Sequence, residues 1–315
     1  MLPKSRLLSF LVLSIGVALL VAGLVAPRFL PGDSRLPLDL TATTWTLTDD
    51  EAQTRLMTDP GGRVLDVPVT RQLHVEIQNP ADEETVTLRV GETLMRDSLQ
   101  EELDRLISAE VWTFGLDRTT GEFTTPATLT DQLASPVSEV PVAGVWLKFP
   151  SDAQQATYEV FEPRLRQTRP AEFAEELDIN GRTIHRYRQQ VEPTNVAELY
   201  ASPFNTTAFA DGERGYLFHS VTRDFLVDRV SGLVVEIRED VDSYYGTVDG
   251  EKREQVLLFE GQMPQQQIDA HLRAAGEIRD PAVVDTVRWV VMGVGGLLIL
   301  AGLVGATGVF ARRRG

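Results

Sequence analysis

Two uninterrupted apolar stretches, Leu7–Ala26 and Trp289–Phe310, flank a long segment in which apolar and polar residues alternate. Neither stretch contains Asp, Glu, Lys, Arg or His. A helix of about 20 apolar residues spans the roughly 30 Å hydrocarbon core of a bilayer. The first stretch is also longer than the apolar core of a signal peptide, which is about 7–15 residues. We therefore expect an uncleaved anchor at each end of the alternating segment.

Basic residues outside the two stretches predict the orientation of the chain. Lys4 and Arg6 precede the first stretch, and Arg312–Arg314 follow the second. Loops rich in Lys and Arg stay in the cytoplasm. The sequence thus predicts a plasma-membrane protein. Its parts are cytoplasmic ends at residues 1–6 and 311–315, spans at 7–26 and 288–310, and an extracytoplasmic region at 27–287.

Small residues recur every fourth position in both spans, which favours close approach of two helices in lipid. The alternative is that small residues are simply common in membrane helices. The candidate helix-packing residues are Ala18, Ala22, Ala26, Ala301, Gly302, Gly305 and Ala306.

The region between the spans is predominantly β in pattern. Residues Arg71–Gln78 and Thr85–Val90 alternate with period two, with Leu73, Val75 and Ile77 on one face. Two such runs separated by a break at Asn79-Pro80 predict an antiparallel pair with one buried face. An earlier run, residues 42–47, predicts a first strand.

Helical signals in this region are short. Ser98 and Glu101 form a capping box, and the apolar spacing that follows predicts a helix through about Ala109. Residues 265–275 repeat apolar positions at helical spacing and predict a second short helix. The three prolines within residues 126–141 predict a connector.

Asn180-Gly181 is the strongest short hairpin signal in the chain. A helix over residues 171–178 is the alternative there. Shifting the sequence by 111 residues aligns similar features, for example Phe114–Gly121 with Phe225–Gly232. We therefore predict an α+β fold, mainly antiparallel β, with two related sheet modules at about residues 40–135 and 142–260 and short flanking helices.

Composition narrows the chemistry. All 46 acidic residues lie between the apolar stretches, and the formal net charge is −16. Such a charge repels nucleic acid and anionic surfaces at long range. The chain has no Cys, so it can form neither a disulfide nor a thiolate metal site. No H-E-x-x-H, G-x-S-x-G or phosphate-binding loop is present. We expect no catalytic residues, metal or cofactor.

A basic run stands out within the acidic region. Arginine suits bidentate contact with phosphate or carboxylate, so the run is a candidate site for a ligand headgroup. The alternative is an exposed face paired with Glu172, Glu175 and Glu176. The candidate headgroup residues are Arg164, Arg166, Arg182, Arg186 and Arg188.

Three segments resemble the actinobacterial PorA-like family of membrane proteins. They are Arg6–Leu47, the segment DFLVDRVSGLVVEIRED (Asp224–Asp240), and the terminal apolar span. The resemblance implies a cell-envelope protein of high-GC Gram-positive bacteria. It carries the label of porin and brings no catalytic residues.

Three functions follow as hypotheses. The first is a membrane-anchored domain that binds a lipid or another apolar envelope component. The second is a porin, as the family label implies. The third is a scaffold in an envelope-synthesis complex. Expected partners are membrane lipids and other envelope membrane proteins, and not nucleic acid.

Overall fold

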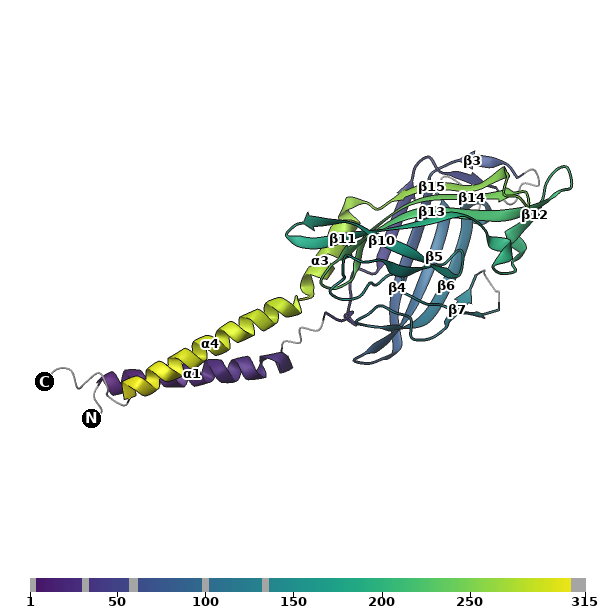
Figure 1. Ribbon diagram of the computed structural model, residues 1–315. Helices are drawn as coiled ribbons and strands as arrows, with labels where there is room; N and C mark the ends of the chain where they lie inside the picture. The colour runs from purple at the N-terminus through teal and green to yellow at the C-terminus, as the bar shows by residue number, and fades with distance from the viewer. Residues whose placement is uncertain (1–3, 30–33, 57–61, 98–101, 132–135, 307–315) are drawn as a thin grey trace. The chain divides into compact units, whose positions relative to one another are not determined.

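The computed structural model describes residues 4–29, 34–56, 62–97, 102–131 and 136–306 (Figure 1). By their contacts they form two compact units. One unit is a pair of helices, α1 (Lys4–Phe29) and α4 (Pro281–Ala306). The other is a β-rich domain, Arg35–Ile278. The described part of each apolar stretch is therefore helical, as predicted, and each helix is long and apolar enough to cross a membrane.

Glycines bring the two helices into backbone contact. A Cβ atom placed on Gly16 would lie 2.7 Å from the carbonyl oxygen of Gly295, and one on Gly302 would lie 2.8 Å from the amide nitrogen of Leu13. Gly295 and Gly302 are seven residues apart, which returns a helix to nearly the same face after two turns. Small residues at such positions allow close packing in lipid.

A side-chain hydrogen bond adds to this contact. Pro27 lies four residues after Gly23 in α1 and has no amide hydrogen, so it cannot bond to the Gly23 carbonyl oxygen. Arg288 of α4 donates from Nε to that oxygen at 3.1 Å. The arginine thus satisfies a carbonyl that the proline leaves without its intrahelical donor.

The structure divides the predicted helix-packing residues. Gly302 and Gly305 lie against α1, at Leu13 and Ser9. The other five have exposed or half-buried positions; they are Ala18, Ala22, Ala26, Ala301 and Ala306. Glycines that the sequence reading did not single out, Gly16 and Gly295, make the closest backbone contacts named above.

The described part of the β-rich domain contains one open sheet of 15 strands. Its first half comprises β1 (Thr44–Asp49), β2 (Gln53–Arg55), β3 (Val64–Asp66), β4 (Val69–Ala81), β5 (Thr85–Arg96), β6 (Leu106–Asp117), β7 (Ala127–Thr130) and β8 (Ser138–Val140). Its second half comprises β9 (Tyr158–Glu162), β10 (Gln167–Ile179), β11 (Arg182–Asn195), β12 (Thr206–Ala208), β13 (Arg214–Asp228), β14 (Val234–Gly246) and β15 (Lys252–Gln262).

The strand order defines two limbs. The first limb is β8-β7-β6-β5-β4-β1, and the second is β15-β14-β13-β11-β10-β9. They meet where β1 pairs with β15, with Thr48 opposite Gln262. In Figure 1 strands β4 to β6 run steeply across the direction of β13 to β15. The sheet therefore folds over, and its two limbs face each other.

The core lies between the limbs. A single cluster of buried apolar residues includes Leu73 and Trp112 of the first limb and Phe225 and Ile237 of the second. Trp112 of β6 packs edge-on against Phe161 of β9, with ring centroids 5.6 Å apart. Large aromatic pairs of this kind add to the stability gained from burial alone.

Helix α3 (Gln265–Glu277) packs on the sheet within this domain. It buries Ile268, Leu272 and Ala275, the residues whose spacing predicted it. His271 stacks on Trp45 of β1 at 4.7 Å and bonds through Nε2 to the Thr44 carbonyl at 2.8 Å. The prediction of this helix is confirmed.

Other elements confirm or correct the sequence reading. The β4–β5 pair and the hairpin at Asn180-Gly181 are antiparallel as predicted, and the helical alternative over residues 171–178 is wrong. The capping box lies outside the described residues. The helix predicted through Ala109 is also wrong, because only Glu102–Arg105 is helical and β6 begins at Leu106. The predicted connector contains β7 and β8.

Two related sheet modules are not confirmed. The aligned segments share a local turn in which Asp117 or Asp228 caps the amides that follow. Each turn ends at a glycine with positive φ, Gly121 or Gly232, packed on the backbone of Lys148 or Phe149. However, β4 and β6 are separated by β5, whereas the strands aligned with them, β11 and β13, are neighbours. The similarity is thus one of turns, because the strand orders differ.

Candidate ligand-binding cavity

A cavity of about 280 Å³ lies between the two limbs of the β-rich domain. One part of its wall is apolar, and another consists of ionisable side chains. The apolar lining is Leu94, Leu106, Ile107, Ala109, Phe204, Leu217, Val241, Val256, Leu257 and Phe259. The ionisable lining is Arg55, Arg71, Glu92, Glu110, Glu162, Arg164, His219, Arg223, Glu239 and Tyr245. A cavity with both kinds of wall suits an amphipathic ligand.

Strand periodicity points the charged side chains inward. In β13, His219 and Arg223 are in phase with the buried residues Leu217, Val221 and Phe225. Alternate residues of a strand face the same side of a sheet. Each charged residue here therefore occupies a position where the pattern otherwise requires an apolar one. Glu239 of β14 and Glu92 of β5 follow the same rule.

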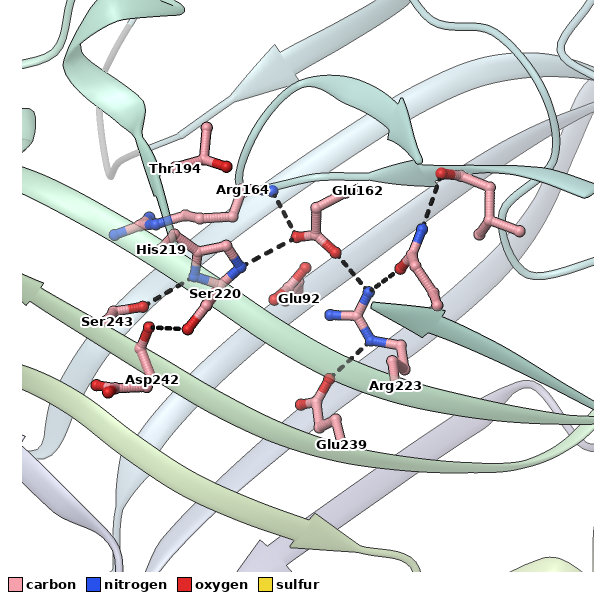
Figure 2. Close-up of polar contacts among 12 residues, drawn as sticks. Glu92, Glu162, Arg164, Thr194, His219, Ser220, Arg223, Glu239, Asp242 and Ser243 are labelled. Carbon is pink, nitrogen blue, oxygen red and sulfur yellow. Dashed lines mark hydrogen bonds and ion pairs between the residues drawn. The ribbon is translucent and has the colours of Figure 1, made fainter. Parts of the chain in front are cut away.

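These side chains form a continuous ion network between the limbs, in part shown in Figure 2. Arg71 of β4 pairs with Glu92 at 2.8 Å and with Glu239 of β14. Arg223 joins Glu239 at 2.9 Å to Glu162 at 2.5 Å. Arg223 and Glu239 are almost fully buried. The network thus links strands of both limbs through their interior.

The network holds Glu162 and Glu239 ionised. Burial by itself would raise the pKa of Glu162, but the Arg223 guanidinium outweighs it and holds that pKa well below its usual range. Arg71 and Arg223 likewise overcome burial and lower the pKa of Glu239. Removing either cation would leave a buried carboxylate without compensation, which costs several kcal/mol.

His219 ends the network beside the cavity. Its Nδ1 lies 2.9 Å from Ser243 Oγ, and burial lowers the pKa of the imidazole. Its Nε2 lies 3.6 Å from Glu162 Oε1, too far for a hydrogen bond. Ser, His and Glu in a row resemble a nucleophilic relay. Glu162 also pairs with Arg223, and the three side chains together form a polar part of the cavity lining.

A second carboxyl pair faces the cavity from the first limb. Glu92 and Glu110 are directly opposite each other on β5 and β6. Burial and then the charge of Glu92 raise the pKa of Glu110 to about 7. Arg164 lies 3.8 Å from Glu110 and opposes the shift only partly. Trp112 Nε1 donates to Glu110 at 3.2 Å.

The structure separates the five arginines of the predicted headgroup site. Arg164 lines the cavity, and Arg166 pairs with Asp131 at 3.2 Å. The remaining three pair with carboxylates of neighbouring strands; they are Arg182 with Asp228, Arg186 with Glu175 and Asp224, and Arg188 with Asp224. Only Arg164 among the five is brought to the cavity lining.

The sequence reading missed the main ionisable residues of the cavity. They are Arg71, Glu92, Glu110, Glu162, His219, Arg223 and Glu239. The available signal was a charged residue in phase with the apolar positions of a strand. Among the described residues, no group of three or more His, Asp or Glu is arranged to hold a metal ion.

Comparison with known proteins identifies the family. The family model "Porin PorA" matches residues 8–304. A protein named "Porin PorA" from Corynebacterium amycolatum is 27% identical over 240 residues, which cover 63% of this chain and 61% of that protein. Another of that name, from Corynebacterium resistens, is 26% identical over 227 residues, covering 62% and 54%. This chain therefore matches less than two thirds of the length of either relative. By the extent of the family match, the chain belongs to the PorA family.

Proposed function

We propose that the β-rich domain binds an apolar or amphipathic component of the cell envelope while α1 and α4 anchor it in the membrane. The cavity between the limbs carries this proposal. Ligand sites are usually concave and mainly apolar, with a few polar groups that fix orientation. The cavity has that composition, with an apolar wall and the buried ion network at another part of its lining. Its volume suits a small amphiphile or one end of a larger one.

The orientation of the chain is part of the proposal. Lys4, Arg6 and Arg312–Arg314 favour cytoplasmic ends, which would leave the β-rich domain outside the cytoplasm. Membrane lipids would then be the nearest source of an amphipathic ligand. The shared family supports a membrane location, because the two relatives described above are named as porins.

Native mass spectrometry of the full chain, released from dodecyl maltoside micelles, tests the binding function. We expect a bound adduct of defined mass, and we expect Ala109→Trp to remove it by filling the cavity. Ala210→Trp is the matched control, because Ala210 is exposed and outside the lining. An adduct that persists in the Ala109 variant, or no adduct in the unaltered chain, would contradict the proposal.

A pore is the second candidate, favoured by the name of the relatives. The apolar stretches of α1 and α4 have no ionisable side chains, so a water-filled path would require several copies. Reproducible conductance steps from the full chain in a planar bilayer would support a pore. A Gly295→Leu variant, which disturbs the helix contact, should then alter the steps.

A further inference from the structure

Charges around the cavity do not balance. Arg55 pairs outside the lining with Glu254 at 3.2 Å, and burial keeps His219 neutral. Three guanidiniums then face four carboxyls; these groups are Arg71, Arg164, Arg223, Glu92, Glu110, Glu162 and Glu239. One negative charge remains when all four carboxyls are ionised. A buried charge without a partner is removed by proton uptake or by binding a counter-ion.

Two polar atoms at this part of the cavity have no hydrogen-bond partner. Oε2 of Glu92 is buried without one, although Oε1 of the same carboxylate pairs with Arg71. Nε2 of His219 is also buried without one, on a side chain that is only 5% exposed. Buried polar groups are nearly always satisfied, and a carboxylate oxygen can only accept, so Oε2 of Glu92 beside the cavity indicates a missing donor. Both residues line the cavity.

We propose that this end of the cavity binds one positive charge, carried by the ammonium head of an amphiphile, in exchange for the proton of Glu110. The inference rests on the proposed binding function and specifies its ligand class. An ammonium supplies both the missing charge and hydrogen-bond donors. The adjoining apolar wall accommodates its hydrocarbon part and favours an amine over a bare alkali cation. An organic ammonium and an alkali cation share the same chemistry, that of a monovalent cation.

The groups that face Glu110 set the sign of the pH dependence. They are Glu92 on β5, Arg164 and Arg166 after β9, and Tyr200; burial together with the charge of Glu92 keeps the pKa of Glu110 near 7. A cation binds the ionised form, so binding should strengthen as pH rises. For a pKa of about 7, the ionised fraction and hence the affinity increase about tenfold from pH 6 to pH 8. At pH 7 about half a proton should be released per ligand.

Calorimetry of the full chain in dodecyl maltoside tests the exchange. The ligands are hexylamine, 1-hexanol, hexanoate and KCl, each titrated in two buffers that differ in ionisation enthalpy so that released protons are counted. We expect hexylamine to bind with proton release and with a higher affinity than either hexanoate or hexanol. Proton release by KCl alone, with no preference for hexylamine, would retain the cation site and identify an inorganic ion as its occupant.

Variants keep the test specific. Glu110→Gln should abolish proton release and lower hexylamine affinity at pH 8 about tenfold. Glu139→Gln, at an exposed position of β8 outside the cavity lining, should change neither. Binding of hexanoate at least as tight as that of hexylamine, or hexylamine binding without proton release, would overturn the cation site and leave the binding function intact. Failure of all three organic probes to bind would overturn both.

Discussion

The helix pair and the β-rich domain bury polar groups in opposite ways. In the helix pair, glycines bring the two backbones together, and Arg288 bonds to the one carbonyl that Pro27 leaves without its usual donor. In the β-rich domain, whole ionic side chains are buried, and Arg223 bridges two carboxylates. Burying ion pairs seldom stabilises a fold more than apolar residues of similar volume would. The network therefore suggests a requirement of the cavity, whereas the helix contact suits an anchor.

The largest effect should come from breaking the ion network. Arg223→Met leaves Glu162 and Glu239 buried without this cation and should lower the free energy of unfolding by about 3–5 kcal/mol. Chemical unfolding of the full chain in detergent at pH 7 measures it. Arg253→Met is the control, because Arg253 pairs with Asp211 on the exposed surface, where water screens the pair, and its loss should change the free energy of unfolding far less. Similar losses of unfolding free energy in both variants would contradict the prediction that Arg223 compensates buried carboxylates.

The second effect concerns the helix contact. Gly295→Leu places a side chain against the backbone of α1 and should cost about 1–3 kcal/mol of association. Gly296→Leu is a matched control, because nothing lies within 4 Å of a Cβ atom at that position. The readout is a disulfide between Ser9→Cys and Gly305→Cys in a chain that has no other Cys. The built Cβ of residue 305 lies 3.3 Å from that of Ser9. Equal cross-linking with Leu at 295 and at 296 would contradict this helix contact.

The success of sequence reasoning also differed between these regions. The apolar stretches predicted both helices, because a span without charges is a strong signal by itself. Gly302 and Gly305 were among the candidates for the contact, but Gly16 and Gly295 were not, since Gly16 and Ala18 differ only in the face of the helix they occupy. Strand periodicity predicted β4 and β5. The helix expected through Ala109 was wrong because Leu106 and Ile107 fit both the helical and the strand period. Pairing with β5 makes this segment a strand.

The cavity could not be assembled from sequence. Arg71, Glu162 and Arg223 come from strands far apart in the chain, and their contact requires the fold of the two limbs. The five arginines chosen for a headgroup were grouped by closeness in sequence. Most of them pair along the sheet surface instead. A better criterion would have been charge in phase with buried apolar residues, which selects His219, Arg223 and Glu239.

An effect of similar size should appear in the pH dependence of stability. The pKa of Glu110 rises from 4.5 to about 7 on folding, so the folded chain binds one more proton than the unfolded chain between these values. Stability contributed by this group is therefore present below pH 4.5 and is lost as pH rises toward 7. Glu110→Gln mimics the protonated form and should be more stable than the unaltered chain at pH 8, by about 1–3 kcal/mol. The Glu110→Gln variant and the unaltered chain should have similar free energies of unfolding at pH 4.5. A variant that is less stable at pH 8 would contradict the assigned burial.

The smallest effect belongs to the single hydrogen bond of the helix pair. Arg288→Leu removes the donor to the Gly23 carbonyl and should weaken helix association by about 0.6–1.7 kcal/mol, the size of interhelical hydrogen bonds in lipid. Pro27→Ala restores an amide hydrogen four residues after Gly23, so it should rescue the Arg288→Leu variant. The same cysteine pair at positions 9 and 305 reports cross-linking in all four combinations of the two substitutions. If Pro27→Ala fails to rescue, Arg288 contributes through its packing or its pairing with Asp285 rather than through this carbonyl.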